Sequence, residues 1–118
     1  MIFEESNLQI NCFKYFRYQY PHLAKLFFAI PNGGRRNARE AARMKAEGVT
    51  AGVADAILLA PSSNGEYNSL CIEFKTEKGR QSDAQKEFQK DAESQGNKYD
   101  IVRNFDDFVF CIKNYLSL

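Results

Sequence analysis

The chain has 118 residues, of which 16 are Lys or Arg and 15 are Asp or Glu, so its formal net charge of +1 does not indicate an acidic or a basic partner. With 44% hydrophobic and 14% aromatic residues, it can bury roughly two thirds of its unfolded surface, which predicts a single domain over 1–118. A charged fraction of 26% with only 3 Pro and 7 Gly excludes a disordered or low-complexity chain.

The sequence also argues against a membrane protein and against a disulfide-rich protein. No apolar run approaches the ~20 residues that span a bilayer, and the first residues lack the basic and apolar regions of a signal peptide. We therefore expect a cytoplasmic protein without a membrane partner. The three cysteines, Cys12, Cys71 and Cys111, are far apart and flanked by apolar residues, which predicts buried thiols rather than disulfides or metal ligands.

The first half of the chain predicts two helices and a strand. Apolar residues recur every four positions between 8 and 20, which indicates an amphipathic helix, and Pro21 ends it. The aromatic-rich run 26–30 predicts a buried strand followed by a turn. Good helix formers over 37–47, followed by Gly48 as a C-cap, predict a second helix near the surface.

The second half predicts a hairpin, a helix, a strand and a last helix. Residues 53–60 are apolar on both faces apart from one aspartate, which is typical of a central strand, and 70–75 form its antiparallel partner. A capping box opens a helix over 82–95, a short strand covers 99–102, and Asn104 caps a final helix. The order αβαββαβα predicts a small sheet with helices on its faces, which is an α/β or α+β sandwich.

Asp55 is the aspartate within the apolar strand, and an isolated buried carboxylate is heavily penalised unless it has a partner. A regular hairpin centred near Gly65 sets Asp55 across from Lys75, with Glu73 on the same face and neighbours roughly 5 to 7 Å apart. Two carboxylates at that distance repel each other unless a cation lies between them, and oxygen ligands favour Mg²⁺ or Mn²⁺. With Lys75 stabilising the negative charge on five-coordinate phosphorus, this arrangement predicts phosphodiester hydrolysis.

An Asp55–Lys75 salt bridge with Glu73 in solvent explains the same three residues, and their spacing alone does not exclude it. The wider pattern favours the nuclease. Gly52-Val53-Ala54-Asp55 followed by Glu73-Phe74-Lys75 resembles the PD-(D/E)xK signature, and the surroundings resemble its VRR-Nuc branch, the virus-type replication and repair nucleases. Further matches span most of the chain: Ile30-Pro31-Asn32-Gly33-Gly34 with Arg36, Gly48-Val49, Gly79-Arg80-Gln81-Ser82 through Gln85, and Gly96 before Tyr99 to Arg103.

This resemblance implies an α/β fold with a restriction-endonuclease-like core, in which helices flank a small mixed central sheet. It also gives roles to the motif residues. It implies that Asp55 and Glu73 hold the metal together with the backbone carbonyl of Phe74, and that Lys75 is catalytic. Ala54 departs from the pattern, which has proline there, and this changes the stiffness of the backbone but not the ligand chemistry.

Two further site residues follow from the resemblance. A glutamate on the first helix often completes the metal site in this family, and Glu5 is the best match, with Glu4 as the competitor. The charge of either one also fits a helix N-terminus without any metal. The glutamine that commonly faces the site matches Gln85, which also fits the capping box.

Basic residues predict where DNA is held. Between 33 and 45, five cations stand against Glu40 alone, and three of them share one helical face that can follow a phosphate backbone, although a solvated basic face explains them as well. Two more basic residues lie in the loop that follows Lys75, beside the predicted cleavage site. The predicted DNA-binding residues are Arg35, Arg36, Arg39, Arg43, Lys78 and Arg80.

The resemblance implies a metal-dependent DNA endonuclease that cuts structured DNA, branched like a Holliday junction or carrying a flap, and leaves a 5′ phosphate. Free-standing members resemble archaeal Holliday-junction resolvases, which implies a homodimer with two equivalent sites. Replication or repair in a phage or bacterial setting is the implied context. Two alternatives remain from the residues: a non-catalytic DNA-binding module with the same fold, and a small interaction domain whose carboxylates are merely ion-paired.

Overall fold

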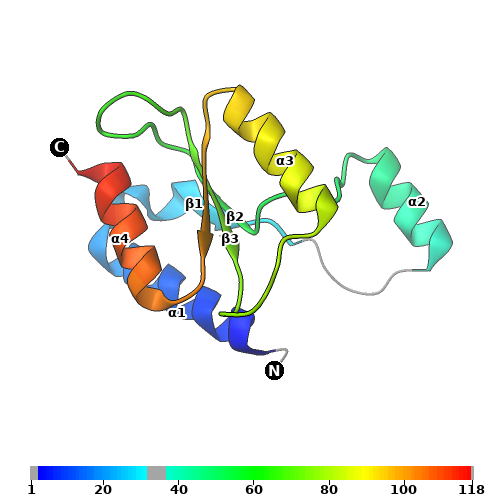
Figure 1. The fold of residues 1–118 in the computed structure, drawn as a ribbon, viewed down its shortest axis with the longest axis horizontal. Coiled ribbons are helices and arrows are strands. Elements are labelled where there is room, and N and C mark those ends of the chain that lie inside the picture. The colour runs from blue at the N-terminus through cyan, green and yellow to red at the C-terminus, as the bar shows by residue number, and fades with distance from the viewer. Residues whose placement is uncertain (1–2, 32–36, 118) are drawn as a thin grey trace.

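Four short strands form one mixed sheet, and helices lie on both of its faces (Figure 1). The computed structural model describes residues 3–31 and 37–117. The strands, in chain order, are β1 (Phe27–Ala29), β2 (Ala56–Leu58), β3 (Leu70–Phe74) and β4 (Lys98–Val102). They lie in the order β1-β2-β3-β4. β2 is antiparallel to both of its neighbours, β1 and β3, whereas β3 and β4 are parallel.

The helices match the predicted order αβαββαβα, with one addition. Their bounds are α1 (Phe3–Gln19), a 3₁₀ helix η1 (Pro21–Leu26), α2 (Ala38–Ala46), α3 (Asp83–Ser94) and α4 (Phe105–Leu116). The 3₁₀ helix was not predicted, because two turns of this kind are too short to show an apolar period. Among residues 3–31 and 37–117, no helix has the length and apolar character needed to cross a bilayer.

The core is divided between the two faces of the sheet. On one face, α1 and α4 cover alternate residues of β3, so that Phe16 and Phe108 pack with Ile72 in the main cluster. On the other face, α3 covers the intervening positions, and Phe88 packs against Tyr99 in a smaller cluster. The predicted alternation along 70–75 is therefore confirmed, and it directs Glu73 toward the α3 side.

Helix starts follow local side-chain signals closely. The Ser82 hydroxyl accepts the N–H of Gln85 while the Gln85 side chain accepts the N–H of Ser82, which completes the predicted capping box. Asn104 caps α4 as predicted, and Asn37 caps α2. Gly48 ends α2 with a φ of 104°, in the left-handed region that favours glycine.

The prediction that 26–30 is a buried strand is wrong in part. β1 pairs only with β2, so it is an edge strand, and only Phe27 of its three residues is buried. Phe27 points into the main cluster, whereas Phe28 is 38% exposed because α3 does not extend over the β1 edge. An apolar run of this length does not distinguish a central strand from an edge strand.

The three cysteines are free and buried, which confirms the prediction. Burial raises the pKa of Cys12 to about 12, and the pKa of Cys71 is also raised by burial. For Cys111, burial and the neighbouring Asp100 carboxylate both raise the pKa. These thiols are therefore protonated at neutral pH, and a protonated thiol is a poor nucleophile and a poor metal ligand.

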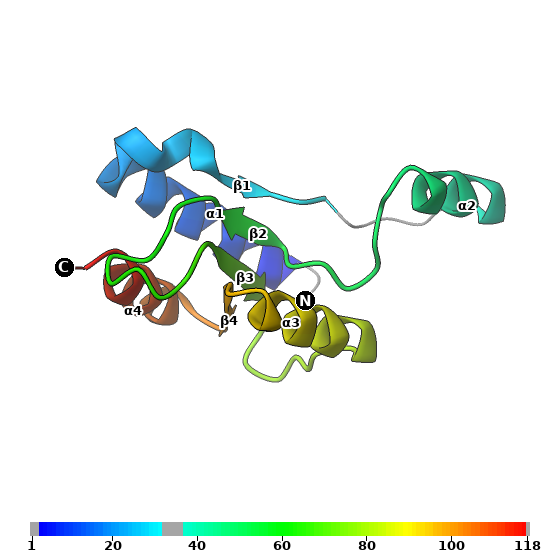
Figure 2. The same cartoon turned by 90° about the horizontal axis from the view of Figure 1, so that it is seen from above.

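α2 stands apart from the rest of the chain, at one end of a molecule that measures 47 × 33 × 26 Å (Figures 1 and 2). None of its residues is buried, and Met44 alone is partly covered. A helix that buries so little is held by its caps and connections rather than by packing. Its predicted surface location is confirmed, and it projects further than the sequence indicated.

Candidate active site

Asp55 lies where β2 and β3 diverge. Its backbone carbonyl accepts the N–H of Ile30 at 2.8 Å, and its Oδ2 accepts the N–H of Phe74 at 2.7 Å. The residue therefore links the chain that follows β1 to the end of β3. It is not inside a strand as predicted, because β2 begins at Ala56 and the aspartate side chain takes the backbone donor that a longer strand would use.

The predicted pairing of Asp55 with Lys75 is wrong. Ala56 lies opposite Ile72, and extending this register by one residue sets Asp55 opposite Glu73. The paired strands are centred on Asn64, one residue before the predicted centre at Gly65, and hydrogen bonds within the connecting loop join Ser62 to Tyr67. The residue opposite Asp55 is two positions from the predicted one, and side chains two positions apart in a strand point to the same face. Asp55 and Glu73 therefore still share a face.

Glu73 is fully buried, and its two carboxylate oxygens have different surroundings. Oε1 accepts hydrogen bonds from the Tyr99 hydroxyl at 2.5 Å and from Gln81 Nε2 at 3.1 Å. Oε2 is also buried, but it receives no hydrogen bond from any described residue. An unsatisfied oxygen on a buried carboxylate is expensive and requires an explanation.

Lys75 follows β3 and is the nearest cation to that oxygen. Its Nζ lies 3.6 Å from Glu73 Oε2, an ion pair without a hydrogen bond, and its side chain is 15% exposed. The loop after Lys75 is held by Arg103, whose Nη1 donates to the carbonyls of Thr76 at 2.8 Å and Gly79 at 2.7 Å. The lysine therefore extends from a fixed backbone and still reaches solvent.

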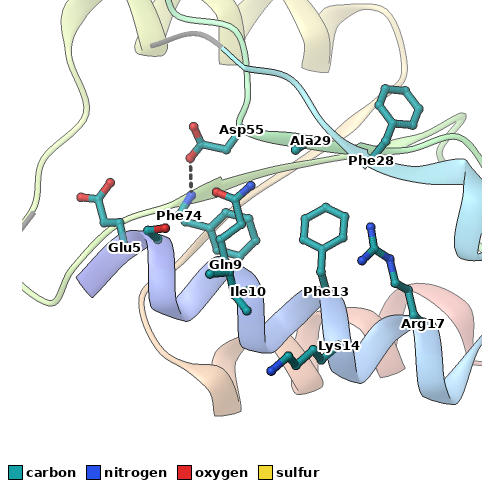
Figure 3. A pocket seen from close by; sticks show the side chains of 11 residues that line it. Glu5, Gln9, Ile10, Phe13, Lys14, Arg17, Phe28, Ala29, Asp55 and Phe74 are labelled. Carbon is teal, nitrogen blue, oxygen red and sulfur yellow. Dashed lines mark hydrogen bonds between the residues drawn. The ribbon is translucent and has the colours of Figure 1, made fainter. Parts of the chain in front are cut away.

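Glu5 approaches the same place from another element. It lies in the first turn of α1 and lines the groove into which Asp55 also opens (Figure 3). Burial raises the pKa of Asp55, and the negative charges of Glu73 and Glu5 raise it further, while the N–H of Phe74 and the charge of Lys75 lower it. The carboxylates of Glu73 and Glu5 are therefore near enough to Asp55 to disfavour its charged form.

The structure also places Phe74 and Gln85. Because the Phe74 N–H points to Asp55, and the N–H and C=O of one residue in an extended strand point to the same side, the Phe74 carbonyl lies on the Asp55 side of β3. Gln85 is half-buried at the start of α3, where its Oε1 is used by the capping box. Its amide nitrogen is the part that remains to face the site.

The residues fit a divalent cation that keeps several waters. Within residues 3–31 and 37–117, no three His, Cys, Asp or Glu side chains stand close enough to hold a metal together, so Glu5 does not complete a ready-made three-carboxylate cage. The unsatisfied Glu73 Oε2 and the raised pKa of Asp55 both indicate negative charge without sufficient compensation. Mg²⁺ is commonly bound by one or two carboxylates with the remaining positions filled by water.

The predicted DNA-binding residues fall in three groups. Arg39 and Arg43 are exposed on α2, far from the sheet (Figure 2). Lys78 and Arg80 are exposed on the loop between β3 and α3, close in sequence to Lys75. The predicted residues Arg35 and Arg36 lie outside the described residues.

Sequence reasoning missed the residues that support Glu73. Tyr99 and Gln81 donate to it, and Arg103 holds the loop that follows Lys75. Gln81 and Arg103 belong to segments that resemble the family pattern, but their roles depend on contacts between distant parts of the chain. The one available signal was that Tyr99 is a polar aromatic residue in a strand, where a buried hydroxyl requires a partner.

The sequence and the fold were compared with those of known proteins. No protein-family model and no curated protein matches the sequence. A solved structure described as a VRR_NUC domain protein is similar to this chain with a TM-score of 0.83 and 25% sequence identity, over 97% of this chain and 88% of that one. The match confirms the restriction-endonuclease-like α/β fold class that the motifs predicted. The chain therefore has the fold of a VRR-Nuc domain.

Proposed function

We propose that this VRR-Nuc domain is a divalent-metal-dependent DNA endonuclease that hydrolyses phosphodiester bonds in branched or flapped DNA. The observation that supports it best is the buried, unsatisfied Oε2 of Glu73, with Lys75 Nζ 3.6 Å away and Asp55 on the same face. A carboxylate retained only for structure would be fully satisfied, because an orphaned buried oxygen reduces stability.

Asp55, Glu73 and the Phe74 carbonyl would hold Mg²⁺ or Mn²⁺, with Glu5 near enough to contribute through water. When bound, such an ion polarises a phosphate oxygen and lowers the pKa of a coordinated water. Lys75 places its ammonium group at the same site, where it stabilises the negative charge that develops on the phosphate. Gln85 has an amide nitrogen left to bind the substrate or a water at the rim of the site.

The remaining chain residues supply phosphate contacts. Lys78 and Arg80 stand on the loop that follows the catalytic strand, and Arg39 and Arg43 stand on the projecting α2. Contacts of this kind hold a backbone without reading its sequence. We propose that two copies act together on a four-way junction, because paired symmetric cuts require two equivalent sites.

Cutting assays test this proposal. The purified chain is incubated with labelled four-way junctions, flaps and duplexes in Mn²⁺, Mg²⁺ or EDTA. We expect cutting of a branched or flapped substrate with either ion, none in EDTA, and 5′-phosphate ends. Lys75→Ala should abolish cutting and keep binding, because the lysine acts on the transition state and one lost cation changes affinity little.

Two outcomes would contradict the proposal. If the parent binds branched DNA but never cuts it with any divalent ion, the chain is a non-catalytic DNA-binding module. If Lys75→Ala cuts at the parental rate, the catalytic assignment of Lys75 is wrong. A matched control is Lys113→Ala, which removes an exposed cation from α4 and should leave cutting unchanged.

A further inference from the structure

A groove of about 630 Å³ lies between α1 and the edge of the sheet (Figure 3). Four of the α1 residues that line it follow one another at intervals of four: Glu5, Gln9, Phe13 and Arg17. Residues four apart lie on one face of an α-helix, so these side chains form a single row, which we call the α1 row. The row covers roughly 18 Å of the helix at the usual rise per residue, and its Glu5 end is near Asp55.

Phe13 anchors the α1 row to the sheet. Its ring is 7% exposed and stacks on the ring of Phe27 in β1, with the centroids 4.2 Å apart and the planes 14° apart. Both rings belong to the main cluster, so α1 cannot shift along β1 without losing this packing. The backbone at Gln9 and at Arg17, one turn of α1 on either side of Phe13, is therefore held in place against the sheet.

Gln9 has a polar group that nothing in the described chain uses. Its side chain rises from α1 toward Asp55 and Phe74 (Figure 3). The residue is half-buried, and its amide forms no hydrogen bond with any side chain or backbone group of the described residues. The neighbouring carboxylates of Glu5 and Asp55 can only accept hydrogen bonds when they are charged, whereas the amide nitrogen of Gln9 can donate two. Gln9 therefore supplies a donor at the acidic end of the groove.

Arg17 supplies a positive charge at the far end of the α1 row. Its guanidinium lies 5.3 Å from the centre of the Phe13 ring, a cation–π contact that limits where the group can point. Among the described residues, no carboxylate forms an ion pair with it. A guanidinium that is not committed to a carboxylate keeps its donors for an anion, and their planar arrangement matches the oxygens of a phosphate.

We propose that the α1 row holds the DNA strand that carries the scissile phosphate, with Gln9 donating to that phosphate and Arg17 binding a phosphate further along the same strand. The acidic end of the row belongs to the proposed metal site, and the cation lies where a phosphate backbone leaving that site would pass. Both contacts are to the backbone, so they position a strand without reading its sequence, whether it is paired or not. This inference rests on the proposed nuclease function and adds two residues to its substrate contacts.

Equilibrium binding tests Arg17 without cutting. Fluorescence anisotropy in Ca²⁺, which also takes oxygen ligands, gives the affinity of the full chain for a labelled duplex and a four-way junction, and a gel of the same samples shows whether the DNA is intact. Arg17→Gln should weaken both and reduce the magnitude of the slope of log K against log salt by about 1. Arg17→Lys should keep the parental slope. Lys25→Gln removes an exposed cation from η1 and should change neither quantity.

Gln9→Ala removes a donor but no charge. It should weaken binding at least about tenfold, the usual cost of a lost hydrogen bond to a charged group, and leave the salt slope unchanged. Gln9→Glu should bind more weakly still, because the added carboxylate repels a phosphate. The control is Gln19→Ala, which removes the same side chain from the exposed last residue of α1 and should bind like the parent.

Cutting at saturating DNA separates the two roles. Gln9→Ala should cut more slowly than the parent in Mn²⁺, because its contact is to the reacting phosphate, whereas Arg17→Gln should cut at the parental rate once the DNA is bound. A parental rate in Gln9→Ala would overturn its place at the scissile phosphate. A parent that binds neither DNA, or parental affinity in both Gln9→Ala and Arg17→Gln, would overturn the α1 row.

The same data distinguish this proposal from the nuclease function. A parent that cuts in Mn²⁺, with Gln9→Ala and Arg17→Gln binding and cutting like their controls, overturns the α1 row alone. A parent whose DNA binding depends on Gln9 and Arg17, but that never cuts with any divalent ion, overturns the nuclease function alone.

Discussion

At the scale of single residues, the two oxygens of the buried Glu73 carboxylate differ: one accepts hydrogen bonds from neighbouring side chains, and the other accepts none from the described residues. Tyr99 and Gln81 both donate to Oε1, and Gln81 is itself held by Gln89 at 2.9 Å. These donors fix the plane of the carboxylate, which leaves Oε2 directed at the site. If Glu73 binds a metal ion as proposed, Tyr99 is a positioning residue that acts through Glu73 rather than on the substrate.

Tyr99→Phe should weaken Mn²⁺ binding by roughly 10- to 100-fold, the usual cost of removing a partner of a metal ligand. Isothermal titration of metal into the purified protein measures this. Tyr115→Phe is the control, because it also removes a hydroxyl from a buried tyrosine, one that donates to the Ala60 carbonyl away from the site. Parental Mn²⁺ affinity in Tyr99→Phe would show that the hydroxyl does not position the ligand.

Asp55 carries a pH prediction. Its pKa in the folded chain is raised by burial and by the Glu73 and Glu5 charges, so the folded state binds more protons than the unfolded state between the ordinary and the raised value. Stability without metal should therefore fall as pH rises through that window. Asp55→Asn keeps an oxygen that can accept the Phe74 N–H, and we expect it to have a higher Tm than the parent at neutral pH in EDTA.

Thermal melts at several pH values check this prediction. The advantage of Asp55→Asn should shrink as the pH falls toward the ordinary pKa of an aspartate, about 3.9, because the parent is then protonated as well. A parent that is more stable than Asp55→Asn at neutral pH without metal would contradict the prediction.

At the scale of elements, the segment before Asp55 is positioned by a close contact with α3. Gly52 has a φ of 82°, and a Cβ placed there would lie 2.4 Å from the backbone carbon and oxygen of Ala84. This approach fixes the segment that carries Asp55 against the first turn of α3. Only glycine fits both the backbone conformation and the space.

Gly52→Ala should therefore destabilise the fold by more than the roughly 1–2 kcal/mol of left-handed strain alone. Gly65→Ala is the matched control, because Gly65 has a φ of 76° but nothing lies within 4 Å of its Cβ position. Urea denaturation of both variants separates strain from collision. Equal losses of stability would show that the contact with Ala84 relaxes without cost.

Features that depend on residues close together in the sequence could be predicted, whereas features that depend on contacts between distant segments could not. The caps at Ser82 and Asn104 were predicted because each depends on residues within one helical turn. The register of Asp55 could not be predicted, because an irregular loop sets it, and the edge position of β1 depends on the strand order of the whole sheet. The common face of Asp55 and Glu73 was predicted because parity does not change with a shift of two residues.

At the scale of the whole molecule, α2 projects beyond the sheet (Figure 2) and carries the basic residues Arg39, Arg43 and Lys45. Its isolation explains why the sequence predicted the helix and its charges but not its distance from the core, since a helix without an apolar face has no packing signal to place it. If the chain cuts DNA as proposed, this arrangement would let α2 contact the DNA that flanks the cut while the sheet holds the scissile phosphate.

Replacing both Arg39 and Arg43 by Ala should lower the affinity for duplex and branched DNA alike. The slope of log K against log salt should decrease in magnitude by about 2, close to one unit for each lost phosphate contact. Anisotropy titrations at several salt concentrations measure it, with Lys25→Ala plus Lys113→Ala as an equal change of charge on η1 and α4. An unchanged slope would show that α2 does not contact phosphates.

The most direct measurement is the change in Tm on adding Mn²⁺ to the parent and to Glu73→Gln. An ion bound to the folded state alone raises Tm as its concentration increases. If Asp55 and Glu73 hold the ion, Mn²⁺ raises the Tm of the parent and leaves Glu73→Gln unaffected, because the glutamine keeps the shape of the side chain without its charge. Equal stabilisation of the two proteins, or none in the parent, would contradict a metal site at Glu73 and with it the proposed hydrolysis.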